Sequence, residues 1–298
     1  MMDLKSFNFL YGKVHKASKE EIMKELHLSE EEYQELEESL SETLQQIIEE
    51  KDKAKTIGPD FVRLTSYLYE DISDQQKGLP HPPAIKPRTG EKITLPAPET
   101  LTMPEISLAQ AINQRKSLRK YSPQPLSLQE LSFLLWATCW VKEFHSTKYN
   151  EFTRRNVPSA GSRHPMECYL LINKVESVPP GLYYYHPLEH ALIKLQTSSD
   201  IAKEIYEACL EQSMVIEDAV TFIFTAVPYR ASWRYQQRAY RYLYVDVGHI
   251  GQNVHLAAEA IQAGACMIGA FVDEAMNHCI GLDEKEEFVI YIAAVGKK

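Results

Sequence analysis

A long amphipathic stretch at residues 240–263 constrains the fold more than any other feature of this sequence. Its apolar residues recur at intervals of three and four, as on the buried face of an α-helix. They are Val247, Ile250, Val254, Ala257, Ala258 and Ile261. We therefore predict a core helix, with Gly264 placed to end it. Gly248 and Gly251 would weaken an isolated helix, so they suggest close approach by another helix or a ligand.

The remaining apolar patterns predict an α+β arrangement around this helix. Two further helical patterns and six strand-like runs follow one another without regular interleaving. The helical patterns span 107–115 and 127–140, and the strand-like runs span 167–174, 181–186, 191–195, 221–227, 265–271 and 288–295. Because helices and strands do not alternate, a doubly wound parallel sheet is not expected.

The first part of the chain is acidic and has helical patterns. Residues 1–55 hold eight Lys and fourteen Asp or Glu, so they carry 8 − 14 = −6 of the net charge of −9. Two capping boxes, Ser18 with Glu21 and Ser29 with Glu32, predict two helix starts. The second helix has an apolar stripe formed by Tyr33, Leu36, Leu40, Leu44, Ile47 and Ile48. A surface helix packed on its own chain is favoured over a specific docking function.

A proline-rich segment separates these helices from the rest of the chain. Between Gly78 and Pro104 the prolines fix φ, remove amide donors and favour extended conformations. We expect an acidic helical extension at 1–60, an arm or linker at 61–105 and one compact domain at 106–298.

Charge and composition argue against several classes of partner. The surplus of acidic residues disfavours nonspecific binding to nucleic acid or to an anionic membrane, because both depend on lysine and arginine. The five cysteines lie far apart without a CxxC pair, so neither a disulfide framework nor a zinc site is expected. The chain has no apolar leader and no run long enough to span a bilayer, which predicts a cytoplasmic location.

The candidate chemistry lies in less familiar segments, because GxGxxG, GxxxxGK[ST], HExxH and GxSxG are all absent. The first is a basic run after a short helical pattern, formed by Arg115, Lys116, Ser117, Arg119 and Lys120. Two guanidiniums and a hydroxyl within one turn suit a phosphate group. Taken alone, such a run is more often a solvated cap at a helix C-terminus.

The second segment is a loop of small residues that leads into a hydrophobic strand. Its residues 158–162 permit a flat ligand to approach the backbone closely, and Ser162, Arg163 and His164 offer donors at the ligand's polar edge. An ordinary turn at the start of a strand explains the same composition equally well.

Together these segments resemble the signatures of one flavoprotein superfamily. RKSLR looks like the Arg-x-Ser-x-Arg/Lys pattern of nitroreductase-like proteins, and PSAGSRHP looks like their flavin loop. Their central helix resembles RAYRYLYVDVGHIGQNVHLAAEAIQAGA of this chain. The sequence around NVPSAGSRHPMECYL is similar to that of the SagB-type dehydrogenase branch. The resemblance begins near Tyr67. It implies the FMN-dependent nitroreductase fold, a central and mainly antiparallel sheet flanked by helices, here with an extra helical N-terminal segment.

The resemblance also implies FMN at the interface of a homodimer, with each site drawing on both chains. The residues implied for its phosphate and ribityl chain are Arg115, Lys116, Ser117 and Arg119, with Lys297 or Lys298 as a second cation. Those implied for the flavin ring are Pro158, Ser159, Ala160, Gly161, Ser162 and Arg163. Gly269 and Ala270 match the stretch whose backbone amide faces flavin N5.

The activity implied is a two-step flavin cycle. NAD(P)H or an organic substrate reduces FMN, and a small acceptor such as a quinone or a nitroaromatic takes the electrons. One alternative is oxidation of azolines in modified peptides, where the branch is thought to use a Lys-Tyr pair. Arg234 and Tyr235 stand at that place, and arginine is a poor base, so a free-standing oxidoreductase is favoured. The other alternative is a flavin-binding protein with little turnover and an interaction role.

Overall fold

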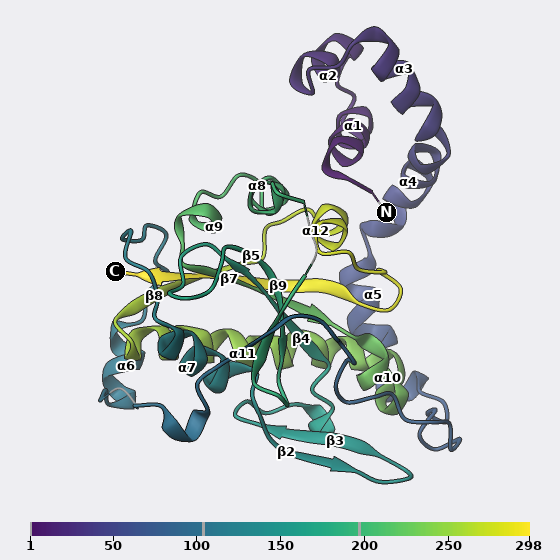
Figure 1. The fold of residues 1–298 in the computed structure, drawn as a ribbon. Helices are drawn as coiled ribbons and strands as arrows, with labels where there is room; N and C mark the ends of the chain where they lie inside the picture. The colour runs from purple at the N-terminus through teal and green to yellow at the C-terminus, as the bar shows by residue number, and fades with distance from the viewer. Residues whose placement is uncertain (1, 103–104, 196–197) are drawn as a thin grey trace.

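The computed structural model describes residues 2–102, 105–195 and 198–298 (Figure 1). The helices are α1 Leu4–Val14, α2 Lys19–Glu25, α3 Glu30–Ser39, α4 Ser41–Ala54, α5 Ile57–Leu64, α6 Leu108–Gln114, α7 Leu128–Thr138, α8 Ile201–Ala208, α9 Met214–Glu217, α10 Pro228–Tyr235, α11 Ala239–Ala260 and α12 Asp273–Cys279. The strands are β1 Lys92–Thr94, β2 Val141–Ser146, β3 Glu151–Arg155, β4 Met166–Ile172, β5 Gly181–His186, β6 Ala191–Lys194, β7 Val220–Ala226, β8 Ala263–Ile268 and β9 Phe288–Lys297. The 3-10 turns are η1 Tyr67–Tyr69, η2 Pro98–Thr100, η3 Ala160–Ser162 and η4 Gln236–Arg238.

An antiparallel sheet of seven strands forms the centre of the molecule, in the order β1-β6-β5-β4-β7-β9-β8. Helices α7 and α11 cover one face, and α8, α9 and α12 cover the other (Figure 1). Every residue of β4 and β7 is buried, which explains why these strands read as continuous apolar runs. The predicted α+β fold, with a mainly antiparallel sheet flanked by helices, is confirmed.

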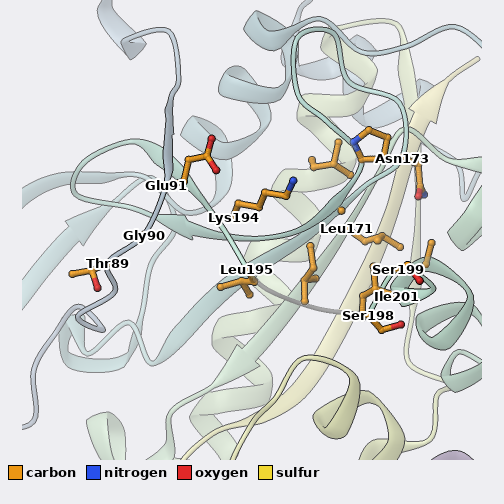
Figure 2. A pocket seen from close by; sticks show the side chains of 15 residues that line it. Thr89, Gly90, Glu91, Leu171, Asn173, Lys194, Leu195, Ser198, Ser199 and Ile201 are labelled. Atoms are coloured by element: carbon orange, nitrogen blue, oxygen red, sulfur yellow. The ribbon is translucent and has the colours of Figure 1, made fainter.

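A surface pocket of about 960 Å³ lies where β4, β5 and β6 meet the loop before α8. Figure 2 shows Glu91 and Lys194 on one side of it and Ser198, Ser199 and Ile201 on the other. Its described lining includes none of the residues predicted to bind a cofactor.

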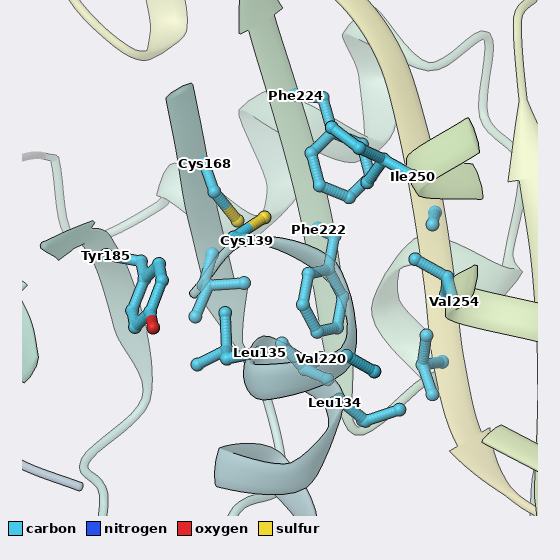
Figure 3. Packing of buried hydrophobic residues seen from close by; sticks show 14 of the residues in the cluster. Leu134, Leu135, Cys139, Cys168, Tyr185, Val220, Phe222, Phe224, Ile250 and Val254 are labelled. Atoms are coloured by element: carbon cyan, nitrogen blue, oxygen red, sulfur yellow. The ribbon is translucent and has the colours of Figure 1, made fainter. Parts of the chain in front are cut away.

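Helix α11 supplies one side of the main core. Figure 3 shows its Ile250 and Val254 beside Phe222 and Phe224 of β7. The six apolar positions predicted for its buried face are all buried. Burying one large apolar side chain contributes roughly 1.5–3 kcal/mol, so the position of α11 on the sheet is strongly determined. A Cβ on Gly251 would lie 3.0 Å from Tyr291 Cε1, whereas Gly248 has nothing within 4 Å.

The N-terminal helices form a small lobe with its own apolar centre. The predicted capping boxes at Ser18 and Ser29 are both present. The buried cluster at this centre consists of Phe9, Ile22, Leu28 and Tyr33. The predicted second helix is divided at Leu40 into α3 and α4, and α1 was not anticipated. Helix α1 contacts α12, and its Leu4 and Phe7 join the core on that face of the sheet.

The predicted arm is held against the compact domain by specific hydrogen bonds. We call residues 65–88 the strap. Arg230 Nε donates to Pro83 O at 2.8 Å, and the amide of Ala84 donates to Glu151 Oε2 at 2.8 Å. Further along, β1 pairs with β6 at the edge of the sheet. Residues 103–104, at the end of the predicted arm, lie outside the described residues.

Two sequence-based expectations about individual elements are corrected, and one hairpin was not predicted. Helix α11 ends at Ala260, and Gly264 lies inside β8 rather than at a helix end, because β8 starts at once and pairs with β9. Strand β8 ends at Ile268, so the predicted strand to residue 271 is too long. The hairpin of β2 and β3 was not predicted, because its mostly exposed side chains give no clear apolar alternation.

His190 connects the β5–β6 turn to α7 inside the core. Its Nε2 lies 2.7 Å from Ser132 Oγ, and its Nδ1 lies 2.7 Å from Tyr185 Oη. The ring is buried. Burial lowers the pKa of His190 from 6.5 to about 4, so the folded protein holds this imidazole neutral.

We expect the free energy of unfolding to decrease as pH falls from 6.5 to about 4, because only the unfolded chain binds a proton at His190 in this window. His190→Asn should reduce this dependence, since asparagine tolerates the φ of 47° found here and does not titrate. Urea unfolding at several pH values measures both slopes. Equal slopes in the variant and the wild type would contradict the assignment.

Candidate functional site

The basic segment, residues 115–120, lies along the edge strand β8. It directly follows α6, whose start is capped by Ser107 Oγ accepting from the amide of Gln110 at 3.1 Å. Ser117 forms a bridge with Ala265, and the amide of Leu118 donates to Ala265 O at 2.9 Å. Within the described ranges, no carboxylate forms an ion pair with Arg115, Lys116, Arg119 or Lys120. The segment therefore presents four uncompensated cations next to a hydroxyl.

A pair of glycines lets the chain lie closely on the sheet at this place. Gly264 of β8 and Gly296 of β9 are direct partners in the register. A Cβ on Gly264 would lie 2.5 Å from Leu118 Cδ2, and one on Gly296 would lie 2.7 Å from Tyr121 Cγ. Any larger residue would displace the chain that carries the basic segment.

Lys297 and Lys298, the predicted second cations at the phosphate, each pair with a glutamate of this chain. The ammonium of Lys297 pairs with Glu130 and donates to Ile261 O at 2.9 Å. Lys298 Nζ lies 2.5 Å from Glu259 Oε2. A phosphate would have to compete with these carboxylates for either lysine.

The small-residue loop is held by a buried carboxylate of α11. Asp246 Oδ2 accepts from Ser159 Oγ at 2.6 Å, and its Oδ1 accepts from the amide of Ala160 at 3.2 Å. Gly161 and Ser162 adopt φ values of 58° and 54°, a left-handed conformation that costs energy for serine. Burial raises the pKa of Asp246 although both hydrogen bonds favour its charged form.

Two of the predicted polar donors point into the protein rather than toward a ligand. Arg163 is buried, donates from Nη1 to Asn150 Oδ1 at 2.8 Å and lies over the Trp233 ring at 5.4 Å. His164 is also buried, and burial lowers its pKa to about 3. These residues therefore support the loop from behind. Ser159, Ala160 and Ser162 are partly exposed, and Pro158 and Gly161 are exposed.

Arg234 and Tyr235 lie directly against this loop. A Cβ on Gly161 would collide with the Tyr235 hydroxyl and would lie 3.3 Å from Arg234 Nη1. The Arg234 guanidinium lies 5.3 Å from the centre of the Tyr235 ring. The structure thus brings the predicted catalytic pair together with the predicted flavin loop.

Gly269 and Ala270 follow the end of β8 and are exposed. A Cβ on Gly269 would meet nothing within 4 Å, so there is open space above this backbone. The carbonyl of Ala270 accepts from Gln212 Nε2 at 2.8 Å, which orients the turn.

The basic segment and the small-residue loop lie at opposite ends of α11. Figure 1 shows α6, which precedes the basic segment, at one end of α11 and α10, which carries Arg234, at the other. The basic segment lies near the second half of the helix. Burial lowers the pKa of His255 in this half, and the nearby charge of Arg115 lowers it further. Asp246 anchors the loop near the first half. Within a single chain, the two groups therefore do not form one compact pocket.

Sequence reasoning missed Asp246 and the Gly264–Gly296 pair. An acidic residue beside the buried positions of an apolar helix was the available signal for Asp246. The glycine pair had no comparable signal, because its role depends on the register between two strands.

The described residues include neither a candidate membrane span nor a candidate metal site. No helix there is long and apolar enough to cross a membrane. No group of three or more His, Cys, Asp or Glu side chains there is placed to hold a metal ion.

Known proteins resemble this chain over more than half of its length. The family described as "Nitroreductase family" matches residues 112–297. A nitroreductase-like protein of Methanocaldococcus jannaschii is 31% identical over 194 residues, which cover 65% of this chain and 92% of its own. The trifolitoxin-processing protein TfxB of Rhizobium leguminosarum bv. trifolii is 32% identical over 144 residues, which cover 47% of this chain and only 39% of its own. A solved nitroreductase-like structure from Anabaena variabilis has a TM-score of 0.55 at 26% identity and covers 70% of this chain and 42% of its own.

The matched region contains the basic segment, the small-residue loop, α11 and the glycine pair. The relationship expected from the sequence motifs is confirmed: the chain belongs to the nitroreductase family.

Proposed function

We propose that this chain is an FMN-dependent oxidoreductase that passes hydride from NAD(P)H or another organic donor to a small acceptor. The observation that supports this most is the uncompensated basic segment seated on β8. A terminal phosphate accepts bidentate, charge-assisted hydrogen bonds from arginine, and a hydroxyl adds a further donor. Since the segment lies inside the matched region, its chemistry and its family point to the same ligand.

The remaining residues fit a flavin in a consistent way. FMN, when bound, supplies the redox chemistry itself, so the chain has to bind, orient and shield it. Arg115, Ser117 and Arg119 would hold the phosphate. The open backbone at Gly269 and the loop at residues 158–162 would lie against the ring system. Lys297 is a weaker candidate because Glu130 already neutralises it.

We further propose that the active form is a homodimer. The two groups of site residues lie at opposite ends of α11, so a twofold partner would bring the loop of one chain toward the basic segment of the other. Tyr244 and Val245 of α11 are 58% and 54% exposed, and Leu108 and Ile112 of α6 are also exposed. Such apolar side chains on two adjacent helices suit an interface between copies.

Arg119→Ala should weaken FMN binding by about 1.5–3 kcal/mol, the usual worth of a hydrogen bond to a charged group. Equilibrium titration of the apoprotein, followed by flavin fluorescence, measures the change. Arg154→Ala is the matched control, because Arg154 is an exposed arginine of β3 that is not among the residues assigned to the phosphate. Equal affinities of the Arg119 and Arg154 variants would remove the phosphate assignment.

Asp246→Ala should weaken FMN binding by a comparable amount, because it removes the carboxylate that holds the loop through Ser159 and Ala160. The thermal midpoint should change little, since the substitution also removes a buried charge that is costly to desolvate. Ser159→Ala removes one of the same bonds, so the double variant should lose less affinity than the sum of the two single ones. Additive losses would show that the carboxylate acts elsewhere.

A second candidate function is azoline oxidation, and similarity to a trifolitoxin-processing protein favours it. Arg234 argues against it, because a guanidinium stays protonated and cannot serve as the base of a Lys-Tyr pair. Tyr235 lies beside that guanidinium and remains available for proton transfer.

We expect FMN-loaded protein to be reduced by NAD(P)H without oxygen, to pass electrons to a quinone, and to leave an azoline-bearing peptide largely unchanged. Visible spectra follow the flavin, and mass spectrometry follows the loss of two hydrogens that accompanies aromatisation. Rapid mass loss without quinone turnover would favour the azoline reaction. A flavin that NAD(P)H fails to reduce and that turns over no substrate would favour a binding role.

A further inference from the structure

Helix α10 and the residues just after it carry four arginines, and three of them use their charge within the protein. Arg230 forms a buried ion pair. Arg238 Nη1 donates to Thr65 O at 2.9 Å, and Arg241 Nε donates to Thr65 Oγ1 at 2.5 Å. Arg234 is exposed and takes part in none of the ion pairs found in the described part of the chain. Its charge is therefore free to meet a ligand.

Three carboxylates on the elements around the small-residue loop have other partners. Asp246 of α11 holds the loop itself. Glu151 Oε2 of β3 accepts from a strap amide at 2.8 Å. Glu167 of β4 pairs with Arg230, with Arg230 Nη2 2.5 Å from Glu167 Oε1. These groups leave the charge of Arg234 uncompensated.

Positive charge also extends from Arg234 to the loop. Burial lowers the pKa of Arg163, and the nearby charge of Arg234 lowers it further. The strap brings two acidic residues, Glu70 and Asp71, toward η4, where the amide of Asp71 donates to Gln236 Oε1 at 3.0 Å. Both lie outside every ion pair of the described residues, so they do not neutralise Arg234. The local field therefore favours an anion.

The guanidinium of Arg234 reaches the exposed surface of the loop. A Cβ on Gly161 would lie 3.3 Å from Arg234 Nη1 and would collide with the Tyr235 hydroxyl. The Arg234 guanidinium lies 5.3 Å from the centre of the Tyr235 ring, which restricts its position. A ligand that lies on the loop at Gly161 would therefore meet an N–H donor and a phenol together.

We propose that the electron acceptor of this site carries a carboxylate, and that Arg234 binds this carboxylate beside Gly161. This rests on the proposed oxidoreductase function. A guanidinium donates two parallel hydrogen bonds to a carboxylate, and one free guanidinium matches the single charge of a carboxylate better than the two charges of a phosphate. Because arginine stays protonated, Arg234 serves as a binding charge and not as a base. The carboxylate contributes binding, and another group of the acceptor takes the electrons.

The binding test uses the full-length, FMN-loaded protein without NAD(P)H and three probes that differ at one group: 4-nitrobenzoate, neutral 4-nitrobenzamide and 4-nitrophenyl phosphate. Isothermal titration measures each affinity. The wild type should bind 4-nitrobenzoate about fivefold more tightly than the amide, as expected for one exposed ion pair. Arg234→Gln should abolish this preference, and Arg234→Lys should keep most of it because the charge remains. Arg154→Gln is the matched control and should keep the whole preference, because Arg154 is an exposed arginine of β3.

Turnover is measured with the same two nitro compounds. Reduction of the nitro group to a nitroso group takes one hydride from NAD(P)H and one proton from the solvent, and it releases one water. The ratio of kcat/KM for 4-nitrobenzoate to that for 4-nitrobenzamide should fall about fivefold in Arg234→Gln, through KM, because the lost ion pair contributes to binding.

The two measurements separate this proposal from the proposed function. A wild type that binds 4-nitrobenzoate selectively through Arg234 but reduces neither probe would defeat the proposed function and still support the carboxylate site. A preference that is absent in the wild type, or that persists in Arg234→Gln, would overturn the site. Loss of the preference in Arg154→Gln as well would also overturn it, since overall charge would then be the cause. Tighter binding of 4-nitrophenyl phosphate that depends on Arg234 would overturn the choice of a carboxylate.

Discussion

The packing of α11 across the sheet is the constraint on which the rest of the structure depends. The helix buries its apolar side against β7 and its neighbours, and Gly251 lets it approach Tyr291 closely. Because interiors are packed at nearly crystalline density, the helix has little freedom to shift or rotate. Asp246 and the loop are positioned from its first half, and β8 with the basic segment follows its end. The loop and the basic segment are therefore both positioned by one rigid helix.

The parts that sequence reasoning predicted correctly are those whose burial is complete. Strands β4 and β7 are buried on both faces, and the inner side of α11 packs against the core. Their apolar patterns therefore follow directly from their burial. The capping boxes at Ser18 and Ser29 were equally legible, because each depends on residues only three apart. Structure that depends on neighbouring residues or on complete burial can therefore be predicted from the sequence.

The parts that it missed depend on contacts between distant residues. Lys297 pairs with Glu130, and Arg163 is buried over Trp233, and neither contact can be read from the local sequence. The strap looked like a linker because proline disfavours regular structure, yet its hydrogen bonds reach residues more than a hundred positions away. Tertiary packing decides whether a polar side chain is exposed to solvent or buried, and the spacing of a motif does not reveal this.

The two edges of the sheet affect how readily copies of this protein aggregate at high concentration. Unpaired strand edges invite other chains to add strands, which is a route to aggregates. On one side the terminal strand β1 has only three residues, begins with a lysine and is followed closely by Pro96. On the other side, residues 117–118 occupy the outer edge of β8. The basic segment therefore also blocks strand addition, and a change that detaches it would lower the colloidal stability of the protein.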